Sequence, residues 1–248
     1  MRRDHGGCLT RLFEIVLFLM ADPGSGCQAS GAKSTVSPVP GQVTLQGHVP
    51  TVVTSGRDAE TGDERVLVSS PAARSENRVT PVGRVSLTVE GSDAGRSAEP
   101  TVLGILQAKL NEQGIGHQVE RGRDWCGEDG ILMVGSHRLV IQVVTGVPDP
   151  SFWKSAKTTS ASRVLSTLRA AELLENAIAM KARTIGESQA RSTLLVIDAR
   201  HAGALASAAV LADYARQFGD PAVRHQFSAV WIVGPTVPHT TRLGSRLP

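Results

Sequence analysis

The first hundred residues contain almost no aromatic side chains. Phe13 and Phe18 are the only two, whereas residues 101–248 contain seven, among them all three tryptophans. Seven of the thirteen prolines also lie in the first hundred residues, among many small residues. Such a segment buries too little apolar surface to offset the entropy that ordering costs. The composition therefore predicts a disordered, low-complexity tail over residues 1–96 and a folded domain over residues 97–248.

Cysteine is equally scarce. Cys8, Cys27 and Cys126 are the only three, and they form neither a CxxC pair nor a cluster with histidine. A disulfide framework and a structural zinc site both need more closely spaced cysteines, so this pattern argues against either. We expect a reducing compartment, the cytoplasm.

Long apolar runs are also missing. The longest lies at residues 12–21 (LFEIVLFLMA), and Glu14 interrupts it. A membrane-spanning helix needs about 20 apolar residues. Arg2 and Arg3 precede the run, so a signal peptide and a translation start placed too far upstream remain alternatives. We expect no membrane association.

Charge is nearly balanced. The formal net charge is +3, and residues 101–248 carry 16 Lys and Arg against 12 Asp and Glu, which makes +4 for that part. This balance permits an anionic partner, but many nucleic-acid-binding domains carry a denser basic patch.

The apolar pattern of the second half predicts alternating helices and strands. Leu103, Leu106 and Leu110 share one face of a helix, and residues 193–197 are almost entirely apolar, as in a strand covered on both faces. In chain order we expect one helix, three strands, and then helix, strand, helix and strand over 101–113, 117–121, 131–134, 138–145, 160–183, 192–199, 204–218 and 228–233. This order predicts an α/β fold with a mixed central sheet flanked by helices. A further short strand is expected within the tail, over residues 84–91.

Two familiar site motifs are incomplete. Residues 26–35 (GCQASGAKST) approach a phosphate-binding P-loop, but Ala32 breaks the spacing, and Pro38 and Pro40 prevent the helix that must follow. Asp198 and His201 follow a buried strand, where α/β folds often place site residues. The chain has no GxSxG nucleophile motif, so a strand-end turn is favoured over a Ser-His-Asp site.

Acidic and amide side chains stand at defined points of the three-strand segment. Glu128 and Asp129 precede its second strand, and Gln142 lies on its third. Together with the element order, this arrangement resembles a degenerate member of the PD-(D/E)XK, or restriction-endonuclease-like, nuclease superfamily. The resemblance implies an αβββαβ core with an added αβ unit. In that family an Asp begins the second strand, and an acidic residue and a Lys two positions apart lie on the third. The carboxylates hold Mg²⁺, and the lysine and metal activate water for attack on a phosphodiester.

The resemblance assigns roles to particular residues. Asp129 matches the strand-two aspartate, Gln142 occupies the acidic position of strand three, and Val144 occupies the lysine position, where it cannot do the lysine's work. Lys181, on the following helix, is the candidate for a relocated lysine. The implied catalytic residues are therefore Asp129, Gln142 and Lys181.

The same resemblance implies a metal site. Asp129 and Gln142 would ligate Mg²⁺, and Glu112 at the end of the first helix would add a carboxylate, with Glu120 on the first strand as the alternative.

Each of these residues also has a structural interpretation. Glu128 and Asp129 before a glycine are ordinary turn residues. Gln142 in an apolar strand can satisfy a buried backbone group, and Lys181 can extend from the edge of its helix into solvent.

Three functions are therefore weighed. The first is a nuclease-like domain that binds nucleic acid and Mg²⁺, with phosphodiester hydrolysis if Lys181 replaces the missing lysine. The second is a catalytically inactive copy of that fold that binds a protein partner. The third is an unrelated small-molecule enzyme on a mixed sheet. Phe152 and Trp153 follow the third strand, and we expect them to cover the sheet edge rather than stack on a base.

Overall fold

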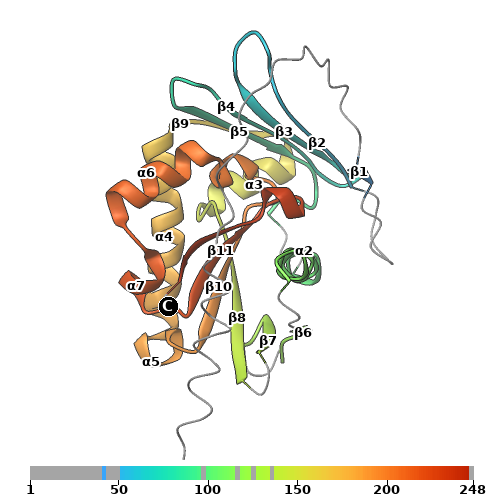
Figure 1. Cartoon of the computed structure of the whole chain (residues 1–248). Coiled ribbons are helices and arrows are strands. Elements are labelled where there is room, and N and C mark those ends of the chain that lie inside the picture. Colours follow the sequence, from blue (N-terminus) through green and yellow to red (C-terminus); the bar gives the residue numbers. More distant parts are fainter. Residues whose placement is uncertain are drawn as a thin grey trace, which may run out of the picture.

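The fold consists of two six-stranded sheets with helices packed around and between them (Figure 1). The computed structural model describes residues 41–42, 51–95, 99–114, 118–123, 127–134 and 137–245. The apolar run at 12–21 and the P-loop-like segment at 26–35 lie outside these residues. Within them, no helix has both the length and the apolar character needed to cross a membrane.

The first sheet is antiparallel and comes largely from the segment predicted to be a tail. Its strands, in spatial order, are β1 (Gly41–Gln42), β2 (Val52–Arg57), β3 (Glu64–Ser69), β4 (Arg74–Val79), β5 (Arg84–Glu90) and β9 (Ala161–Ser166). The prediction of a segment without regular structure is therefore wrong for residues 52–79, whereas the strand expected over residues 84–91 is confirmed as β5. Alternate positions of β5 are fully buried, and they are occupied by valine and leucine: Val85, Leu87 and Val89.

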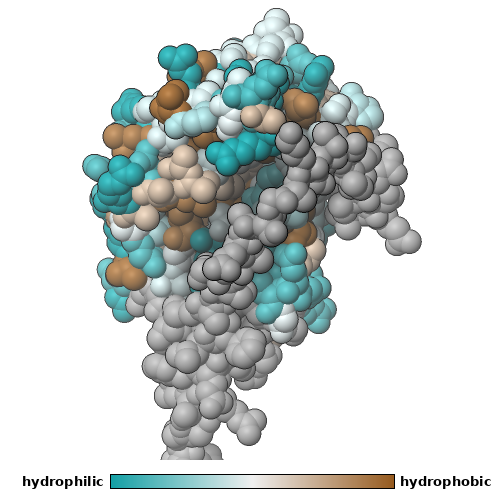
Figure 2. Space-filling view, turned by 45° about the horizontal axis from the view of Figure 1, so that its top comes forward, coloured by the Kyte–Doolittle hydropathy of each residue, from teal (hydrophilic) through white to brown (hydrophobic). Residues whose placement is uncertain are grey.

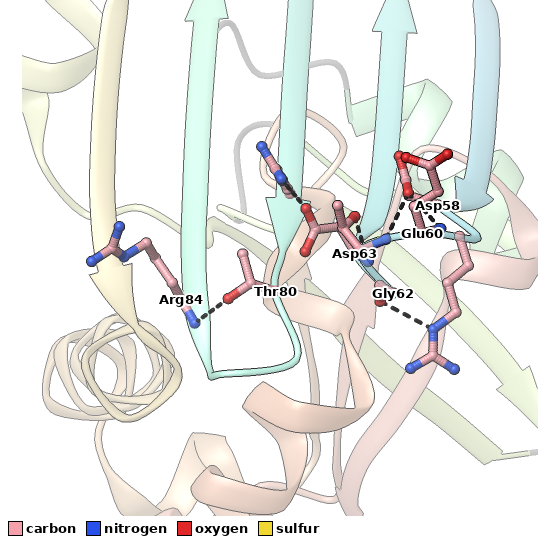
Figure 3. A network of polar contacts seen from close by, with 9 residues as sticks. Asp58, Glu60, Gly62, Asp63, Thr80 and Arg84 are labelled. Atoms are coloured by element: carbon pink, nitrogen blue, oxygen red, sulfur yellow. Dashed lines mark hydrogen bonds and ion pairs between the residues drawn. The ribbon is translucent and has the colours of Figure 1, made fainter.

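Local polar bonds fix the turns of this sheet (Figure 3). Between β2 and β3, Oδ1 of Asp58 accepts hydrogen bonds from the backbone N–H groups of Glu60 at 3.0 Å and Thr61 at 2.9 Å. Between β4 and β5, Thr80 Oγ1 accepts a bond from the backbone N–H of Arg84 at 3.0 Å. Short polar side chains of this kind favour turns because they can bond to nearby backbone groups.

The second sheet is mixed. Its spatial order is β12 (Thr241–Ser245), β11 (Ala229–Val233), β10 (Thr193–Asp198), β8 (His137–Thr145), β7 (Gly130–Val134) and β6 (Gln118–Arg121). Strands β8, β10 and β11 are parallel, whereas β6, β7 and β12 run antiparallel to their neighbours. The α/β fold with a mixed sheet, predicted from the sequence, is confirmed.

Helices cover both faces of the second sheet (Figure 1). Helix α2 (Glu99–Glu112) lies on one face, where Leu106 and Leu110 pack with Ile141 and Trp231. The helices α4 (Thr167–Ile185), α6 (Ala208–Phe218) and α7 (Pro221–His225) lie on the other face. The short segments α5 (Glu187–Ala190), η2 (Gly203–Ala206) and η3 (Val237–His239) complete the chain.

A buried acidic group joins the helices of the second face. Glu175 of α4 accepts a hydrogen bond from Tyr214 of α6 at 2.7 Å and contacts His225 of α7 at 2.9 Å. Burial opposes ionisation, but the bonds from His225 and Tyr214 hold the pKa of Glu175 below its ordinary value. This network sets how α4, α6 and α7 pack against one another.

The crossover between β8 and β10 differs from the predicted single helix over 160–183. Residues 161–166 are strand β9, and the helix that follows, α4, starts at Thr167 with Ser166 as its N-cap. A further helix, α3 (Pro150–Thr158), begins where proline predicted only a break, because Asp149 caps it and Pro150 occupies its first turn. Phe152 of α3 is buried in the apolar core, so it is not available to stack on a base.

Strand β9 links the two sheets. It pairs with β5 from Val85↔Leu165 to Val89↔Ala161, although it lies in the chain between two strands of the second sheet. One apolar cluster contains Leu87 of the first sheet together with Leu174 of α4 and Ile197 of β10. A domain boundary at residues 96 and 97 would divide this sheet and this core.

The described surface lacks one dominant apolar patch on the face seen in Figure 2, where brown residues are interspersed with teal ones. The large hydrophobic side chains that are exposed belong to separate elements: Val52, Val82, Val164, Leu168, Met180 and Val223. Scattered exposure of this kind is usual for a folded chain.

Candidate functional site

The turn between β6 and β7 positions Asp129. At its start, a Cβ on Gly122 would overlap the carbonyl of Glu128, so only glycine fits there. At its end, a Cβ on Gly130 would stand 2.9 Å from Cδ2 of Leu103, because α2 packs closely on the sheet at this point. The two glycines therefore hold Asp129 at the beginning of β7, as the sequence predicted.

Asp129 lies directly beside Gln142. The register pairs Gly130 with Ile141, and the backbone N–H of Asp129 donates to the carbonyl of Ile141 at 3.2 Å. One Asp129 carboxylate oxygen, Oδ2, accepts a hydrogen bond from the backbone N–H of Val143 at 2.6 Å. Residues opposite each other in adjacent strands project to the same face. The structure thus brings the two principal predicted metal ligands together.

Gln142 is almost fully buried, with 2% of its surface exposed. Its Nε2 donates to the carbonyl of Gly127 at 2.6 Å, which ties β8 to the turn before β7. This bond fixes the orientation of the amide and leaves Oε1 as the atom that could ligate a metal. The bond is also the structural role that a buried glutamine is expected to fill.

The electrostatic surroundings of Asp129 identify its charged neighbours. Burial raises the pKa of Asp129 above its ordinary 3.8, while the hydrogen bond from Val143 lowers it. The charge of Glu99 raises the pKa further, and the charge of Lys181 lowers it. Of these four influences on the pKa of Asp129, the charge of Lys181 is the smallest.

Glu99, rather than Glu112, is the acidic residue of α2 on the side of Asp129. The two glutamates occupy opposite ends of a 14-residue helix, about 20 Å apart along its axis. Glu112 pairs with Lys109 at 2.9 Å. Because β6 runs back along α2, the start of the helix lies beside the start of β7. The order of helix and strands in the chain already implied this placement, so the prediction of Glu112 as the additional carboxylate chose the wrong end of the helix.

Lys181 and Val144 line a common cavity of about 530 Å³. Val144 projects to the same face of β8 as Gln142, because strand side chains alternate. Asp149, Trp153 and Met180 also line this cavity. The relocated-lysine position and the original lysine position therefore line one cavity on the face that α4 covers, whereas Asp129 and Gln142 are not among its lining residues.

The remaining acidic candidates have other roles. Glu128 contacts Arg123 and Arg138, which lower its pKa to about 2 and hold the turn together. Glu120 is exposed on β6. Of the acidic pair at 128–129, only Asp129 therefore faces Gln142.

The strand-end pair Asp198 and His201 forms a structural turn. Asp198 accepts hydrogen bonds from Arg200 through its backbone at 3.1 Å and its guanidinium at 2.8 and 2.9 Å. Burial lowers the pKa of His201 below 6.5. These contacts agree with the favoured interpretation of this segment.

Within the described residues, no three His, Cys, Asp or Glu side chains gather into a group that could hold a metal ion. A metal at this site would therefore depend on Asp129, the amide oxygen of Gln142 and water. Mg²⁺ accepts such a set, because it commonly keeps several waters and one or two carboxylates.

No protein-family model, curated protein or solved structure matches this chain. Any functional assignment therefore depends on the geometry of the site.

Proposed function

We propose that this chain is a nuclease-like domain that binds nucleic acid and a divalent metal ion at Asp129 and Gln142, and whose phosphodiester hydrolysis depends on Lys181. The observation that carries the proposal is the position of Asp129, which directly precedes β7 and lies beside Gln142 of β8. The charge of Lys181 acts on the Asp129 carboxylate as a weaker, supporting feature.

The topology of the second sheet supports the proposal. Helix α2, the antiparallel strands β6, β7 and β8, helix α4 and the parallel strand β10 follow in the order αβββαβ. Helix α6 and strand β11 then add one αβ unit. This is the order implied by the resemblance to the restriction-endonuclease-like fold, with α3 and β9 inserted in the crossover.

Each residue has a distinct task in the proposal. Asp129 and Gln142 Oε1 would hold the metal, with Glu99 placed to add negative charge. Lys181 would contact a phosphate oxygen from the cavity that it lines. A bound Mg²⁺ would polarise a phosphoryl oxygen and lower the pKa of a bound water.

Metal binding is tested by thermal unfolding of the full chain with and without millimolar Mg²⁺ or Mn²⁺. We expect the melting temperature to rise with metal, because an ion that binds only the folded state stabilises it. Asp129→Asn should abolish the rise, and Glu112→Gln, at the far end of α2, should keep it. A wild-type melting temperature that changes with neither Mg²⁺ nor Mn²⁺ would contradict the proposed site.

Catalysis is tested with labelled single- and double-stranded DNA and RNA. We expect metal-dependent cleavage that Lys181→Gln removes, while binding of nucleic acid persists in both proteins. Arg183→Gln, exposed on the same helix but on another face, is the matched control. Equal cleavage by the Lys181 and Arg183 variants would exclude the assigned role of Lys181.

A catalytically inactive scaffold is the second candidate. The hydrogen bonds of Asp129 to Val143 and of Gln142 to Gly127 favour it, since both side chains already have structural partners. Binding of a protein partner that survives Asp129→Asn, without any metal-dependent rise in melting temperature, is the result expected of this alternative.

A further inference from the structure

The cavity that Lys181 lines, called the Lys181 cavity from here on, has the size of a small-molecule site. Its volume is about 530 Å³, and ligand pockets commonly measure about 300–1,000 Å³. Residues of α4 at spacings of three and four share the helix face that forms one wall: Ala177, Met180, Lys181 and Thr184. The end of β8, the loop after it and the first turn of α3 form the other walls. Of the described residues that line the cavity, only Ala177 is buried, so a ligand can reach the walls from solvent.

Trp153 contributes an aromatic surface to this cavity. Its indole Nε1 donates to the carbonyl of Val147 at 2.8 Å, and a Cβ on Gly95 would stand 2.5 Å from its Cδ2. These two contacts hold the ring in place, and they occupy its only hydrogen-bond donor. Trp153 can therefore offer a ligand only apolar ring surface, which packs well against another flat ring.

The remaining walls are apolar or carry hydroxyls that already have backbone partners. The apolar side chains beside Trp153 are Val144, Pro148, Pro150 and Met180. Thr184 Oγ1 donates to the carbonyl of Met180 at 2.9 Å, and Thr145 Oγ1 accepts from the backbone N–H of Val147 at 3.4 Å. The cavity therefore suits the face of a flat ring more than its polar edge.

Two charged residues line the cavity within the described part of the chain, and one of them is neutralised. Asp149 pairs with Arg163 and accepts hydrogen bonds from the hydroxyl of Ser151 at 2.6 Å and its N–H at 2.9 Å. Lys181 forms no ion pair with any residue that the structure describes. Asp129, on which the charge of Lys181 acts weakly, does not line the cavity. The uncompensated charge is therefore positive and suits an anion.

Helix α3 adds a second cation next to the aromatic surface. Lys157 is exposed and lies one helical turn after Trp153, so the two side chains project from adjacent points of α3. No described residue forms an ion pair with Lys157. An aromatic ring flanked by Lys181 and Lys157 matches a chain that repeats one flat ring and one anion in every unit.

We propose that the Lys181 cavity binds one unpaired base of a single-stranded nucleic acid, with the ring against Trp153 and the adjoining phosphate at Lys181. A base inside a duplex is stacked and must leave the helix to enter a pocket, so the cavity selects single strands. Stacking on an aromatic side chain tolerates any sequence, so the four bases should bind alike. This binding mode rests on the nucleic-acid binding proposed above and deepens it, but it needs neither the metal ion nor cleavage.

Fluorescence anisotropy of labelled oligonucleotides with the full chain, in the presence of a chelator, tests the binding mode. We expect a single strand to bind at least tenfold more tightly than the duplex of the same sequence. It should also bind at least tenfold more tightly than a strand of equal length whose sugars carry no bases, because that strand keeps the phosphates alone. Equal binding of single strand and duplex would overturn the proposal. Nucleoside monophosphates that bind as tightly as the strand would also overturn it, since the ligand would then be a free nucleotide.

A failure of this binding mode is distinguishable from a failure of the metal site. A preference for single strands without a metal-dependent rise in melting temperature would refute the metal site and support the base-binding cavity. A metal-dependent rise together with equal binding of single strand and duplex would do the reverse. Absence of binding by every nucleic acid would overturn both.

Substitutions at Trp153 locate the base. Trp153→Ala removes the stacking surface and should weaken binding of the single strand about tenfold. Trp153→Phe keeps an aromatic ring and should restore most of the affinity. Neither change should alter binding of the strand without bases. Unchanged affinity in a folded Trp153→Ala protein would place the base elsewhere and overturn the proposal.

A second variant decides the matter if Trp153→Ala does not fold. Met180 is 51% exposed, so Met180→Glu should leave the fold intact, and its carboxylate in the cavity wall should repel the phosphate at Lys181. Leu168→Glu is the matched control, because Leu168 is 40% exposed on the same helix but does not line the cavity. We expect at least tenfold weaker binding of the single strand by Met180→Glu than by Leu168→Glu. Equal affinities of these two variants would exclude the Lys181 cavity as the binding site.

Discussion

At the scale of single residues, the candidate site combines structural and chemical roles in the same side chains. The resemblance to the PD-(D/E)XK superfamily singled out Asp129, which follows a turn signal, and Gln142, the lone polar residue of the next strand. It could not predict which Gln142 atom faces the turn, since both amide orientations are compatible with a buried strand. Nor was Glu99 identified, although a strand that runs back along α2 already implies that the start of α2 lies beside the start of β7.

The pH dependence of stability should reveal the buried state of Asp129. Burial raises its folded-state pKa above 3.8, so the folded protein holds the proton more tightly than the unfolded chain does. The contribution of Asp129 to the free energy of unfolding therefore falls as the pH rises from 3.8 through the raised pKa of the folded state. At higher pH this contribution stays constant at its lower value. An asparagine side chain cannot ionise, so Asp129→Asn should be the more stable protein at pH 7 in the presence of a chelator.

Urea unfolding between pH 3 and pH 7 measures this difference. The gap in free energy of unfolding between Asp129→Asn and wild type should widen as pH rises and then level off. A gap that narrows over the same range would mean that the folded state favours the carboxylate, contrary to the burial argument.

At the scale of elements, the sequence predicted those helices and strands in which the periodic pattern of apolar residues is uninterrupted. The elements α2, β6, β7, β8, β10 and β11 lie where the apolar pattern placed them. The crossover was mispredicted because β9 and α4 follow each other without a loop. Ser166 ends the strand and caps the helix at once, so a continuous apolar pattern resembled one longer helix.

Removing that cap should destabilise the crossover. Ser166 Oγ accepts a hydrogen bond from the backbone N–H of Arg169 at 3.2 Å. Ser166→Ala removes this acceptor, and we expect a loss of about 1 kcal/mol in the free energy of unfolding. Ser166→Asp keeps an acceptor at the N-cap and should stay close to wild type. Urea unfolding of the two variants measures the difference, and equal losses would show that the cap does not carry the effect.

At the scale of the whole molecule, the prediction of a disordered tail was wrong for much of the first half because composition describes that half as an isolated chain. Val85, Leu87 and Val89 bury completely, but their partners lie in β9, α4 and β10, far along the sequence. A segment with few aromatics can therefore fold when another part of the chain supplies the rest of its core. No local property of residues 52–90 encodes that contribution.

This shared core predicts a single cooperative unfolding transition. Leu87 is fully buried, so Leu87→Ala should cost about 2–5 kcal/mol, whereas Val82→Ala, 89% exposed, should cost almost nothing. In a background in which Trp125 and Trp153 are replaced by phenylalanine, the fluorescence of Trp231 reports on the second sheet. If the sheets unfold together, the tryptophan transition should move to lower urea in Leu87→Ala and coincide with the transition seen by circular dichroism. A tryptophan midpoint that does not move would show that the two sheets unfold separately.

Strand β9 is synthesised well after β5, its neighbour in the first sheet, and this order has a consequence for biosynthesis. Strand β5 ends at Glu90, and β9, which pairs with the edge of β5 opposite β4, does not begin until Ala161. Ribosomes add about 5–20 residues per second, so the open edge of β5 waits roughly 4–14 seconds for its neighbour. During that interval the nascent chain exposes unpaired backbone groups and valine and leucine side chains, which other strands could pair with. Translation speed over residues 91–160 should therefore control how much of the newly made protein aggregates.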